Sequence, residues 1–467
     1  MAPTPVRSGG GQNGSQQAPS VLGACGFRIC WMFQGFSVPN SFSLLSLRDT
    51  RPLGGTGFKR RTVKELMAKN GKNVVTVSTR DASLKKRLRR HLKSLGFSKA
   101  QDGTLVPPGT GKDVVRAIHS AQRSDRLEAS RAFLSGRASN LFKHFASGED
   151  VDPARISPVL QPISSDTWEG DLFRLASLTW SVPVSNGFGR RLRFLVWDDH
   201  NGKLIGIIAI GDPVFNLSVR DNLIGWDVKA RGERLVNIMD AYVLGALPPY
   251  NALLGGKLVA CLIRSRDVYN HFSKTYGKTT GIISGQQKKA RLLAVTTSSS
   301  MGRSSVYNRL KLGGTEYFSP IGYTGGWGHF HIPDDLFADL RDYLREIGHS
   351  YADHHQFGEG PNWRMRATRA ALEALGFGDA LLRHGIEREV FLCQLADNAF
   401  KLLRTGKGKP DLSSLHSADH ISKLAVERWM LPRSERRPEF RAWKREGIET
   451  LLFDPNPEVR LRLRRLV

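Results

Sequence analysis

The stretch RLRFLVWDDHNGKLIGIIAIGD, Arg191 to Asp212, decides the fold class. Two apolar runs flank the segment DDHNGK, and Asn201-Gly202 is a strong signal for a tight turn between antiparallel strands. We therefore predict a β-hairpin here. We also predict strands over residues 234–247, which Pro248-Pro249 end, and over residues 290–299.

The segments around this hairpin predict a mixed α/β core over residues 151–335. A helix that begins at Gly255-Gly256 supports that class, and a proline-rich stretch marks the start of the core. We predict a basic helical region over residues 56–150 and a helical region with a basic tail over residues 336–467. Residues 1–55 differ in composition from the rest and predict a disordered or extraneous extension without an assigned function.

The charge is spread unevenly along the chain, whose formal net charge is +26. Residues 51–150 carry 22 Lys and Arg against 8 Asp and Glu, and residues 361–467 carry 21 against 14. Residues 151–360 are nearly neutral, with 23 against 20. Basic ends around a neutral centre favour a polyanionic partner, with nucleic acid ahead of an acidic membrane.

Composition also limits the class of protein. No apolar run is long enough to span a bilayer, and the N-terminal apolar stretch lacks the basic start of a secretion signal. No pair of cysteines has zinc-finger spacing, and Cys261 and Cys393 lie in apolar surroundings typical of reduced core residues. We therefore expect a cytoplasmic protein with no membrane partner.

The basic segment NGKNVVTVSTRDASLKKRLRRHLKSLGF, residues 70–97, predicts a short strand followed by a helix. Leucines recur along one face of that helix, at positions 84, 88, 92 and 95. No acidic residues are interleaved with the charges on its other faces, so we predict a helix that contacts phosphates; the alternative is a solvated face. The candidate contacts are Lys85, Lys86, Arg87, Arg89 and Arg90.

Seven segments, spread in order over most of the chain, resemble one family. They are LFRLASLTWSVPVSNGFGRRLRFLVWD, IAIGDPVFNLSVRDNLIGWD, LPPYNALLGGKLVA, SSSMGRSSVYNRLKL, GYTGGWGHFHI, GPNWRMR and LRHGIEREVFL. Together they are similar to the DruA family, the first component of the Druantia anti-phage defence system, a domain of unknown function found on mobile elements. The resemblance implies a defence or mobile-element protein that works near DNA beside helicase-like partners, and it implies no known reaction.

The stretch GGWGHFHIPDDL, residues 325–336, predicts a metal site if HFHI is a strand. His329 and His331 would then project from the same side, and two imidazoles side by side suit a divalent metal. The pair also resembles that of the HUH single-strand endonucleases, in which a tyrosine on a nearby helix attacks the phosphate. The alternative is a strand end whose histidines bond to backbone or carboxylate groups. Candidate partners on the next segment are Tyr343, Tyr351 and Gln356.

Carboxylates supply further candidate metal ligands. Asp212 ends the second strand of the hairpin, and Asp240 lies within an apolar strand, where an unpaired carboxylate is costly to bury. Together with His329 and His331 they would bind Mg²⁺ or Mn²⁺ for nuclease or strand-transfer chemistry. Tyr307 is a candidate nucleophile. In the alternative, Asp240 pairs with an arginine at position 190, 191 or 193, and Tyr307 packs or stacks.

Other residues are candidate contacts with nucleic acid. Gly255-Gly256 would expose N–H groups at a helix N-terminus beside Lys257, and Arg303 follows a serine-rich strand end. Trp363 would stack on a base, unless it packs in the core at the start of a helix. The full set outside residues 85–90 is Arg190, Arg191, Lys257, Arg303, Trp363, Arg364 and Arg366.

The segment PPYNALLGGKLVA, residues 248–260, also resembles the pyrophosphate loop of the GNAT acetyltransferases. That resemblance implies a GNAT-like fold with acetyl-coenzyme A on this loop, although the glycine spacing departs from that family. We reject a nucleotide-binding P-loop in PPGTGKD, because Val106 stands where the motif needs glycine and Asp113 where it needs Ser or Thr. A helix start with Asp113 in its first turn explains these residues better.

We therefore expect a DNA-binding protein of an anti-phage defence system or mobile element, with metal-dependent nicking or strand transfer as its candidate chemistry. Two alternatives stay open. One is a GNAT-like acyltransferase that uses acetyl-coenzyme A, and the other is a non-catalytic DNA-recognition subunit that works with a helicase.

Overall fold

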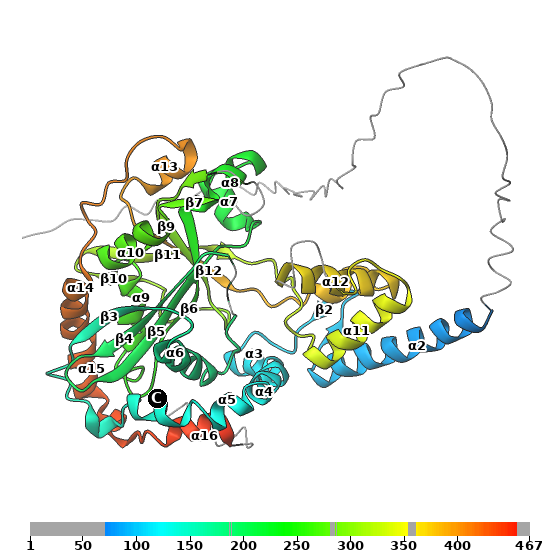
Figure 1. Ribbon diagram of the computed structural model, residues 1–467, viewed down its shortest axis with the longest axis horizontal. Helices are drawn as coiled ribbons and strands as arrows, with labels where there is room; N and C mark the ends of the chain where they lie inside the picture. Colours follow the sequence, from blue (N-terminus) through cyan, green and yellow to red (C-terminus); the bar gives the residue numbers. More distant parts are fainter. Residues whose placement is uncertain are drawn as a thin grey trace, which may run out of the picture. The chain divides into compact units, whose positions relative to one another are not determined.

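The computed structural model describes residues 71–454 except 186, 188, 281–284, 286 and 354–360 (Figure 1). These residues all belong to one compact unit. The predicted extension over residues 1–55, the candidate ligand Gln356 and the predicted basic tail after residue 454 lie outside the described residues.

An eight-stranded sheet organises the described part of the chain, in the order β10-β11-β12-β9-β6-β5-β4-β3. Its first four strands in sequence form an antiparallel meander. The predicted hairpin is confirmed: Arg191 pairs with Gly211 at one end and Asp198 with Lys203 at the other. The strands are β3 Pro158–Ile163, β4 Arg191–Asp198, β5 Lys203–Gly211, β6 Ile238–Ala246, β9 Ala294–Ser298, β10 Leu310–Leu312, β11 Thr315–Tyr323 and β12 Glu389–Gln394.

The centre of the sheet holds its parallel pair. β6 and β9 run side by side over only three residue pairs, from Ile238 with Ala294 to Asp240 with Thr296. β12 then pairs antiparallel with β9 and β11, so the prediction that EVFLCQ is helical was wrong. A central strand buried on both faces reads as a continuous apolar run, which its periodicity cannot distinguish from a buried helix.

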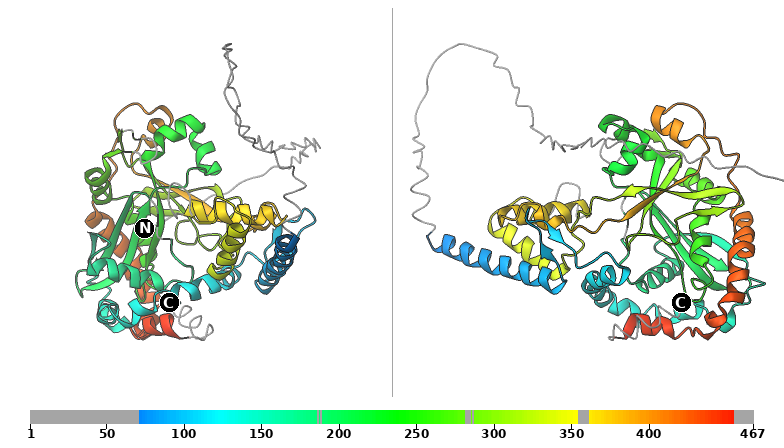
Figure 2. Two further views of the ribbon diagram at one scale, coloured as in Figure 1. Left: turned by 45° about the vertical axis from the view of Figure 1, so that its right-hand side comes forward. Right: turned by 180° about the vertical axis from the view of Figure 1, so that it is seen from behind.

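Helices cover both faces of the sheet (Figure 2). Alternate residues of a strand point to opposite faces. Leu192, Phe194 and Val196 therefore join the cluster that includes α9, α10 and α14, whereas Leu195 joins the cluster that includes α5, α6 and α16. The mixed α/β class is thus confirmed.

The remaining helices complete the unit. The predicted helical stretch after residue 112 is divided among α3, α4 and α5, and Asp113 lies in the first turn of α3, as the rejection of a P-loop requires. The helices are α2 Gly71–Ser94, α3 Lys112–Ile118, α4 Ser120–Glu128, α5 Arg131–Ser135, α6 Trp168–Leu178, α7 Ser218–Ile224, α8 Val228–Arg234, α9 Gly255–Leu262, α10 Arg266–Tyr276, α11 Asp334–Glu346, α12 Pro361–Ala374, α13 Ala399–Thr405, α14 Ala418–Ala425, α15 Leu431–Arg436 and α16 Gly447–Phe453. Short 3₁₀-helical segments are η1 Ser139–His144, η2 Gly148–Asp150, η3 Leu235–Asn237, η4 Ala380–Leu382 and η6 Pro438–Ala442, and η5 Val426–Met430 is a short π-helical segment. The short paired strands are β1 Ser98–Lys99, β2 Leu105–Val106, β7 Lys278–Thr280 and β8 Gln287–Lys289.

A second hydrophobic core lies apart from the sheet. It is built by α2, α3, α11 and α12, and its members include Leu84, Leu88 and Leu92. The prediction of a strand before Asp81 was wrong, because α2 is continuous from Gly71 to Ser94. A run of β-branched residues is only a weak preference for a strand, and here the backbone is helical.

Two expectations from the sequence, on the state of the cysteines and on membrane-spanning segments, can be compared with this fold. Cys261 and Cys393 are free thiols, both fully buried, as predicted for reduced core residues. No helix within the described residues is both long and apolar enough to cross a membrane.

Candidate nucleic-acid interface

The basic face of α2 is positioned by its leucines. Leu84, Leu88 and Leu92 are buried against the second core, so residues 86, 89, 90 and 93 project to the opposite side of the helix. Lys86, Arg89, Arg90 and Lys93 are exposed, and Lys85 is half-buried. The predicted leucine stripe and the solvent-facing charges therefore coexist on one helix.

Not every charge on α2 is available to a ligand. Within the described residues, the ion pairs of α2 join Arg80 to Glu346, and Arg87 to both Asp335 and Asp339 of α11. Arg87 is therefore tied to the protein, contrary to the expectation that this helix lacks acidic partners. The guanidinium of Arg89 lies over the ring of Phe377 at 5.6 Å.

Arg190 and Asp212 form an ion pair at the end of the hairpin. Asp212 accepts hydrogen bonds from the Arg190 backbone N–H at 2.9 Å and from its Nε at 2.8 Å. Any side chain at Gly189 would clash with the Asp212 carboxylate. Arg190 also donates to the Val236 carbonyl, so both residues are engaged in structural contacts. The backbone of neighbouring Arg191 is bonded to the Tyr276 hydroxyl.

Asp240 lies at the central parallel pair without the predicted arginine of β4. Its Oδ1 accepts a hydrogen bond from Thr296 Oγ1 at 2.7 Å. Burial raises the pKa of Asp240 to about 6, while the Thr296 hydroxyl and the charge of Arg220 act in the opposite direction. Arg220 itself is fully buried and pairs with Asp221 at 2.7 Å.

Tyr307 fills the opening between β6 and β9. Beyond Asp240 the two strands no longer pair, and side chains bond to the β6 carbonyls instead: Tyr307 Oη donates to Leu244 at 3.2 Å and Thr297 Oγ1 donates to Ala241 at 2.9 Å. The Tyr307 ring packs against Phe318 and Phe391. Burial raises the pKa of its hydroxyl. These contacts correspond to the packing alternative for Tyr307.

In the strand-to-helix segment before α9, backbone N–H groups donate to carbonyls of the same segment. The N–H of Gly255 donates to the Tyr250 carbonyl at 2.8 Å, and that of Lys257 donates to Leu254 at 2.9 Å. The Lys257 ammonium lies over the Trp429 ring at 5.4 Å. One of the two N–H groups predicted to bind a phosphate, that of Gly255, therefore has a partner within the protein.

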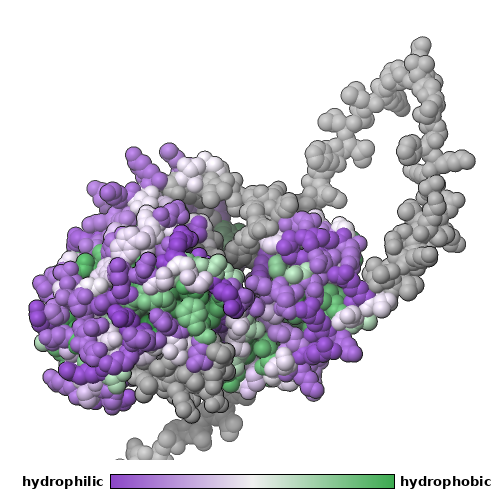
Figure 3. Space-filling view, turned by 60° about the horizontal axis from the view of Figure 1, so that its bottom comes forward, coloured by the Kyte–Doolittle hydropathy of each residue, from purple (hydrophilic) through white to green (hydrophobic). Residues whose placement is uncertain are grey.

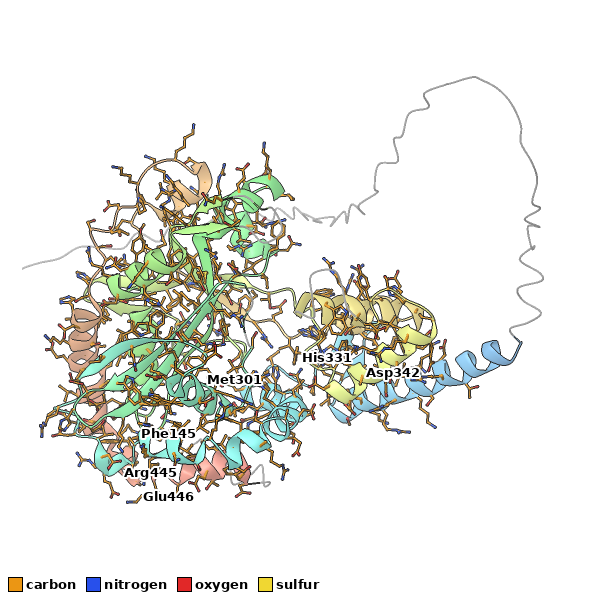
Figure 4. All side chains as sticks on the ribbon, viewed as in Figure 1. Phe145, Met301, His331, Asp342, Arg445 and Glu446 are labelled. Atoms are coloured by element: carbon orange, nitrogen blue, oxygen red, sulfur yellow. The ribbon has the colours of Figure 1, made fainter. Side chains whose placement is uncertain are left out.

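The stretch HFHI is a turn, so the strand on which the paired histidines depended is wrong. Gly326 and Gly328 have φ of 59° and 157°; glycine adopts the first of these readily, and the chain bends at this point. His331, labelled beside α11 in Figure 4, is 2% exposed and bonds through Nε2 to the Leu381 carbonyl at 2.9 Å. Its Nδ1 is buried without a partner among the described residues.

Burial keeps these histidines neutral. It lowers the pKa of His331 to about 3, with nearby His384 adding to the effect. It lowers the pKa of His329 to about 4, together with the charge of Arg364. The His331 side chain therefore corresponds to the backbone-bonded alternative.

Three further residues that sequence reasoning missed surround Phe330. His119 stacks on its ring with centroids 4.5 Å apart, His384 meets it edge-on at 4.7 Å, and the Arg388 guanidinium lies 5.3 Å from its centre. Arg388 also contacts His119 Nε2 at 3.4 Å. His119 is distant in sequence from His384 and Arg388, so no local signal could have grouped it with them.

The predicted metal ligands do not converge. No group of three His, Cys, Asp or Glu side chains in the described part of the chain is placed to hold a metal ion. Asp212 is ion-paired, Asp240 is hydrogen-bonded to Thr296, and His331 is hydrogen-bonded to the Leu381 carbonyl. The donor set therefore does not fit Mg²⁺ or Mn²⁺, and we derive no reaction step through a metal.

The remaining candidate contacts differ in accessibility. Trp363 is 7% exposed and donates from Nε1 to the Tyr351 carbonyl, so its ring packs in the core at the start of α12. Arg364 pairs with Asp334 at 2.5 Å. Arg366 lies beside an open depression on α12, and Arg303 is exposed.

Comparison with known proteins now decides the family. The family model described as "Druantia protein DruA" matches residues 109–405. A "Druantia protein DruA" of Escherichia coli (strain UMEA 4076-1) is 63% identical over 399 residues, which cover 84% of this chain and 99% of that relative. The chain belongs to the DruA family. The resemblance seen in the sequence is confirmed, and this DruA-family chain is a component of an anti-phage defence system.

No solved structure matches this DruA-family chain. Its sheet, its second core and its buried polar contacts are therefore interpreted from its own geometry.

Proposed function

We propose that this chain is a DNA-recognition subunit of the Druantia system that contacts phosphates through the exposed face of α2. One observation carries the proposal: Lys86, Arg90 and Lys93 share one solvent-facing side of the helix, opposite its buried leucines. They are spaced four and three residues apart, which stacks them on successive turns. Helicase-like partners would act on the DNA that this subunit holds.

The proposal assigns no catalytic step to the subunit. The candidate ligands for a metal do not converge, which gives nicking and strand transfer no support. Acyl transfer is disfavoured because Tyr307 and Thr297 occupy the opening beside β6, and because N–H groups of the α9 segment already have partners. The surface in Figure 3 is largely hydrophilic, with smaller hydrophobic areas, as suits contact with a charged polymer.

The test is the salt dependence of DNA binding by a K86Q/R90Q/K93Q variant. Each phosphate neutralised on duplex DNA contributes about −0.9 to the slope of log K against log salt. Removing three contacts should reduce the magnitude of that slope by about 2.7. Fluorescence anisotropy over a range of salt concentrations measures it, with duplex and single-stranded probes compared side by side.

The matched control is K401Q/K407Q/K409Q, which removes three exposed lysines on and after α13. It should keep the wild-type slope. An equal reduction of the slope in both variants would mean that DNA binding depends only on the total charge of the protein. An unchanged slope in the α2 variant would exclude α2 as the contact surface.

A further inference from the structure

A pocket of about 720 Å³ lies between α6, the segment around α4 and α5, and the strands β4 and β6. We call it the arginine pocket, because Arg126, Arg137, Arg174 and Arg193 all line it. Its size is within the range of pockets that bind small molecules. None of these arginines was singled out from the sequence as a ligand contact.

Positive charge in the arginine pocket exceeds negative charge. Four arginines face two carboxylates, Asp166 and Asp171. The ion pair formed among these described side chains joins Arg137 to Asp171 at 3.4 Å. Arg174 instead lies over Phe133 at 4.1 Å, and Arg193 lies over Phe173 at 5.6 Å. The Arg174 and Arg193 guanidinium groups contact these rings and, for Arg174, the Ser130 hydroxyl at 3.3 Å. Guanidinium groups in such surroundings are suited to phosphate oxygens.

Two polar groups in the wall of the arginine pocket lack hydrogen-bond partners. The Arg193 Nε and the Tyr242 hydroxyl are both buried and unpaired within the described residues. The Tyr242 ring is held in place by close packing, since a Cβ at Gly187 would lie only 2.7 Å from it. Buried groups of this kind are rarely left unsatisfied in native proteins, so a ligand atom is a reasonable partner for each.

The lining of the arginine pocket also includes an aromatic surface. Trp168, the first residue of α6, is 49% exposed and stacks on His144 at 5.1 Å. Asp166, just before it, provides carboxylate oxygens as hydrogen-bond acceptors. An indole near several arginines suits a ligand that combines a flat ring with a phosphate.

We propose that the arginine pocket binds a nucleotide, with its terminal phosphate on Arg174 and Arg193 and its base beside Trp168. The nucleotide is either free in solution or the 5′-phosphorylated end of a DNA strand, since both present a terminal phosphate group beside a base. The inference goes beyond the role of α2 and shares no residue with it.

Calorimetry with full-length protein tests the site with ADP, and then with a short single strand that carries a 5′-phosphate or a 5′-hydroxyl. R174Q and R193Q should each weaken binding by about tenfold or more. Y242F, which removes only a hydroxyl, should weaken it roughly threefold. R131Q is the matched control, because Arg131 is exposed and paired with Glu128 outside the pocket.

The two probes distinguish the sources of the nucleotide. Saturable ADP binding identifies a free nucleotide, whereas binding that requires the 5′-phosphate of the strand identifies a strand end. The proposal is overturned if the wild type binds neither probe at millimolar concentration, or if R131Q weakens binding as much as R193Q. The K86Q/R90Q/K93Q variant should keep full ADP affinity, so the proposal for α2 and the proposal for the arginine pocket can fail independently.

Discussion

Single charged residues in the sheet are defined by partners that the sequence does not reveal. The sequence offered an arginine at position 190, 191 or 193 as the alternative to a metal for Asp240, but Arg190 pairs with Asp212, and Asp240 bonds to Thr296 on a strand that lies far along the chain. The first pair neutralises both charges. The second leaves the Asp240 carboxylate bonded to a neutral hydroxyl, and burial raises its pKa although that bond acts in the opposite direction.

Asp240→Asn should alter how stability depends on pH. Between the ordinary pKa of 3.8 and the folded value of about 6, the folded protein keeps a proton that the unfolded chain releases. Stability from this group therefore falls as pH rises through that window, and the loss is complete above it. Asparagine does not ionise, so the free energy of unfolding of the variant relative to wild type should be higher at pH 8 than at pH 4.5. Urea unfolding at both values measures the difference.

Asp212→Asn provides the comparison for that experiment. It leaves Arg190 without its carboxylate and should destabilise the fold at both pH values. A constant difference between Asp240→Asn and wild type across the pH range would show that Asp240 is ionised normally in the folded protein.

Burial was easier to predict from the sequence than chemistry. The spacing of Leu84, Leu88 and Leu92 was sufficient to place them in a core, because a helical stripe is a local property. For Trp363 and Tyr307, packing in the core was the alternative role predicted from the sequence, and both side chains are packed in the structure. The arginine pocket was missed because its lining comes from helices and strands that are distant in sequence.

Secondary-structure elements were predicted well where a turn signal bounded them. The hairpin of β4 and β5 has Gly202 at its turn with φ of 66°. HFHI failed as a strand because the glycines around it bend the chain. EVFLCQ failed as a helix because a two-sided buried strand shows no period of two.

The junction of β6 and β9 leads to a prediction for Tyr307→Phe. The change removes the hydroxyl that bonds to Leu244, so a carbonyl beside the unpaired part of β6 loses its partner. The free energy of unfolding should fall by about 1–2 kcal/mol. Tyr323→Phe is the control, since Tyr323 is 44% exposed, and it should change stability by less than about 0.5 kcal/mol.

Chemical denaturation and a DNA-nicking assay together make that test decisive. A stable Tyr307→Phe variant that loses a nicking activity of the wild type would restore the nucleophile hypothesis. Lower stability without any change in activity supports the packing role.

At the scale of the whole molecule, the described unit contains separate hydrophobic cores. One pair of clusters lies on the two faces of the sheet, and another cluster is built by α2, α3, α11 and α12. Around the latter lie His119, His329, His331 and His384, from three separate points of the chain. Elements that are far apart in sequence therefore depend on the same buried, neutral imidazoles.

Acid should open this second core before the sheet. Burial lowers the pKa of His331 to about 3 and that of His119, His329 and His384 to about 4. The ordinary pKa of a histidine is 6.5. Below that pH the histidines of the unfolded chain become protonated while those of the folded protein stay neutral, so their contribution to stability is complete above pH 6.5 and is lost as pH falls. Each histidine lowers the free energy of unfolding by up to about 1.4 kcal/mol per pH unit over this range.

Hydrogen exchange at pH 7 and pH 5, corrected for intrinsic rates, should show protection lost in α11 and α12 before β4, β5 and β6. His331→Gln should reduce the acid sensitivity, while His420→Gln, at an exposed position, should leave it unchanged. Simultaneous loss of protection in helices and sheet would instead mean that the two cores unfold together.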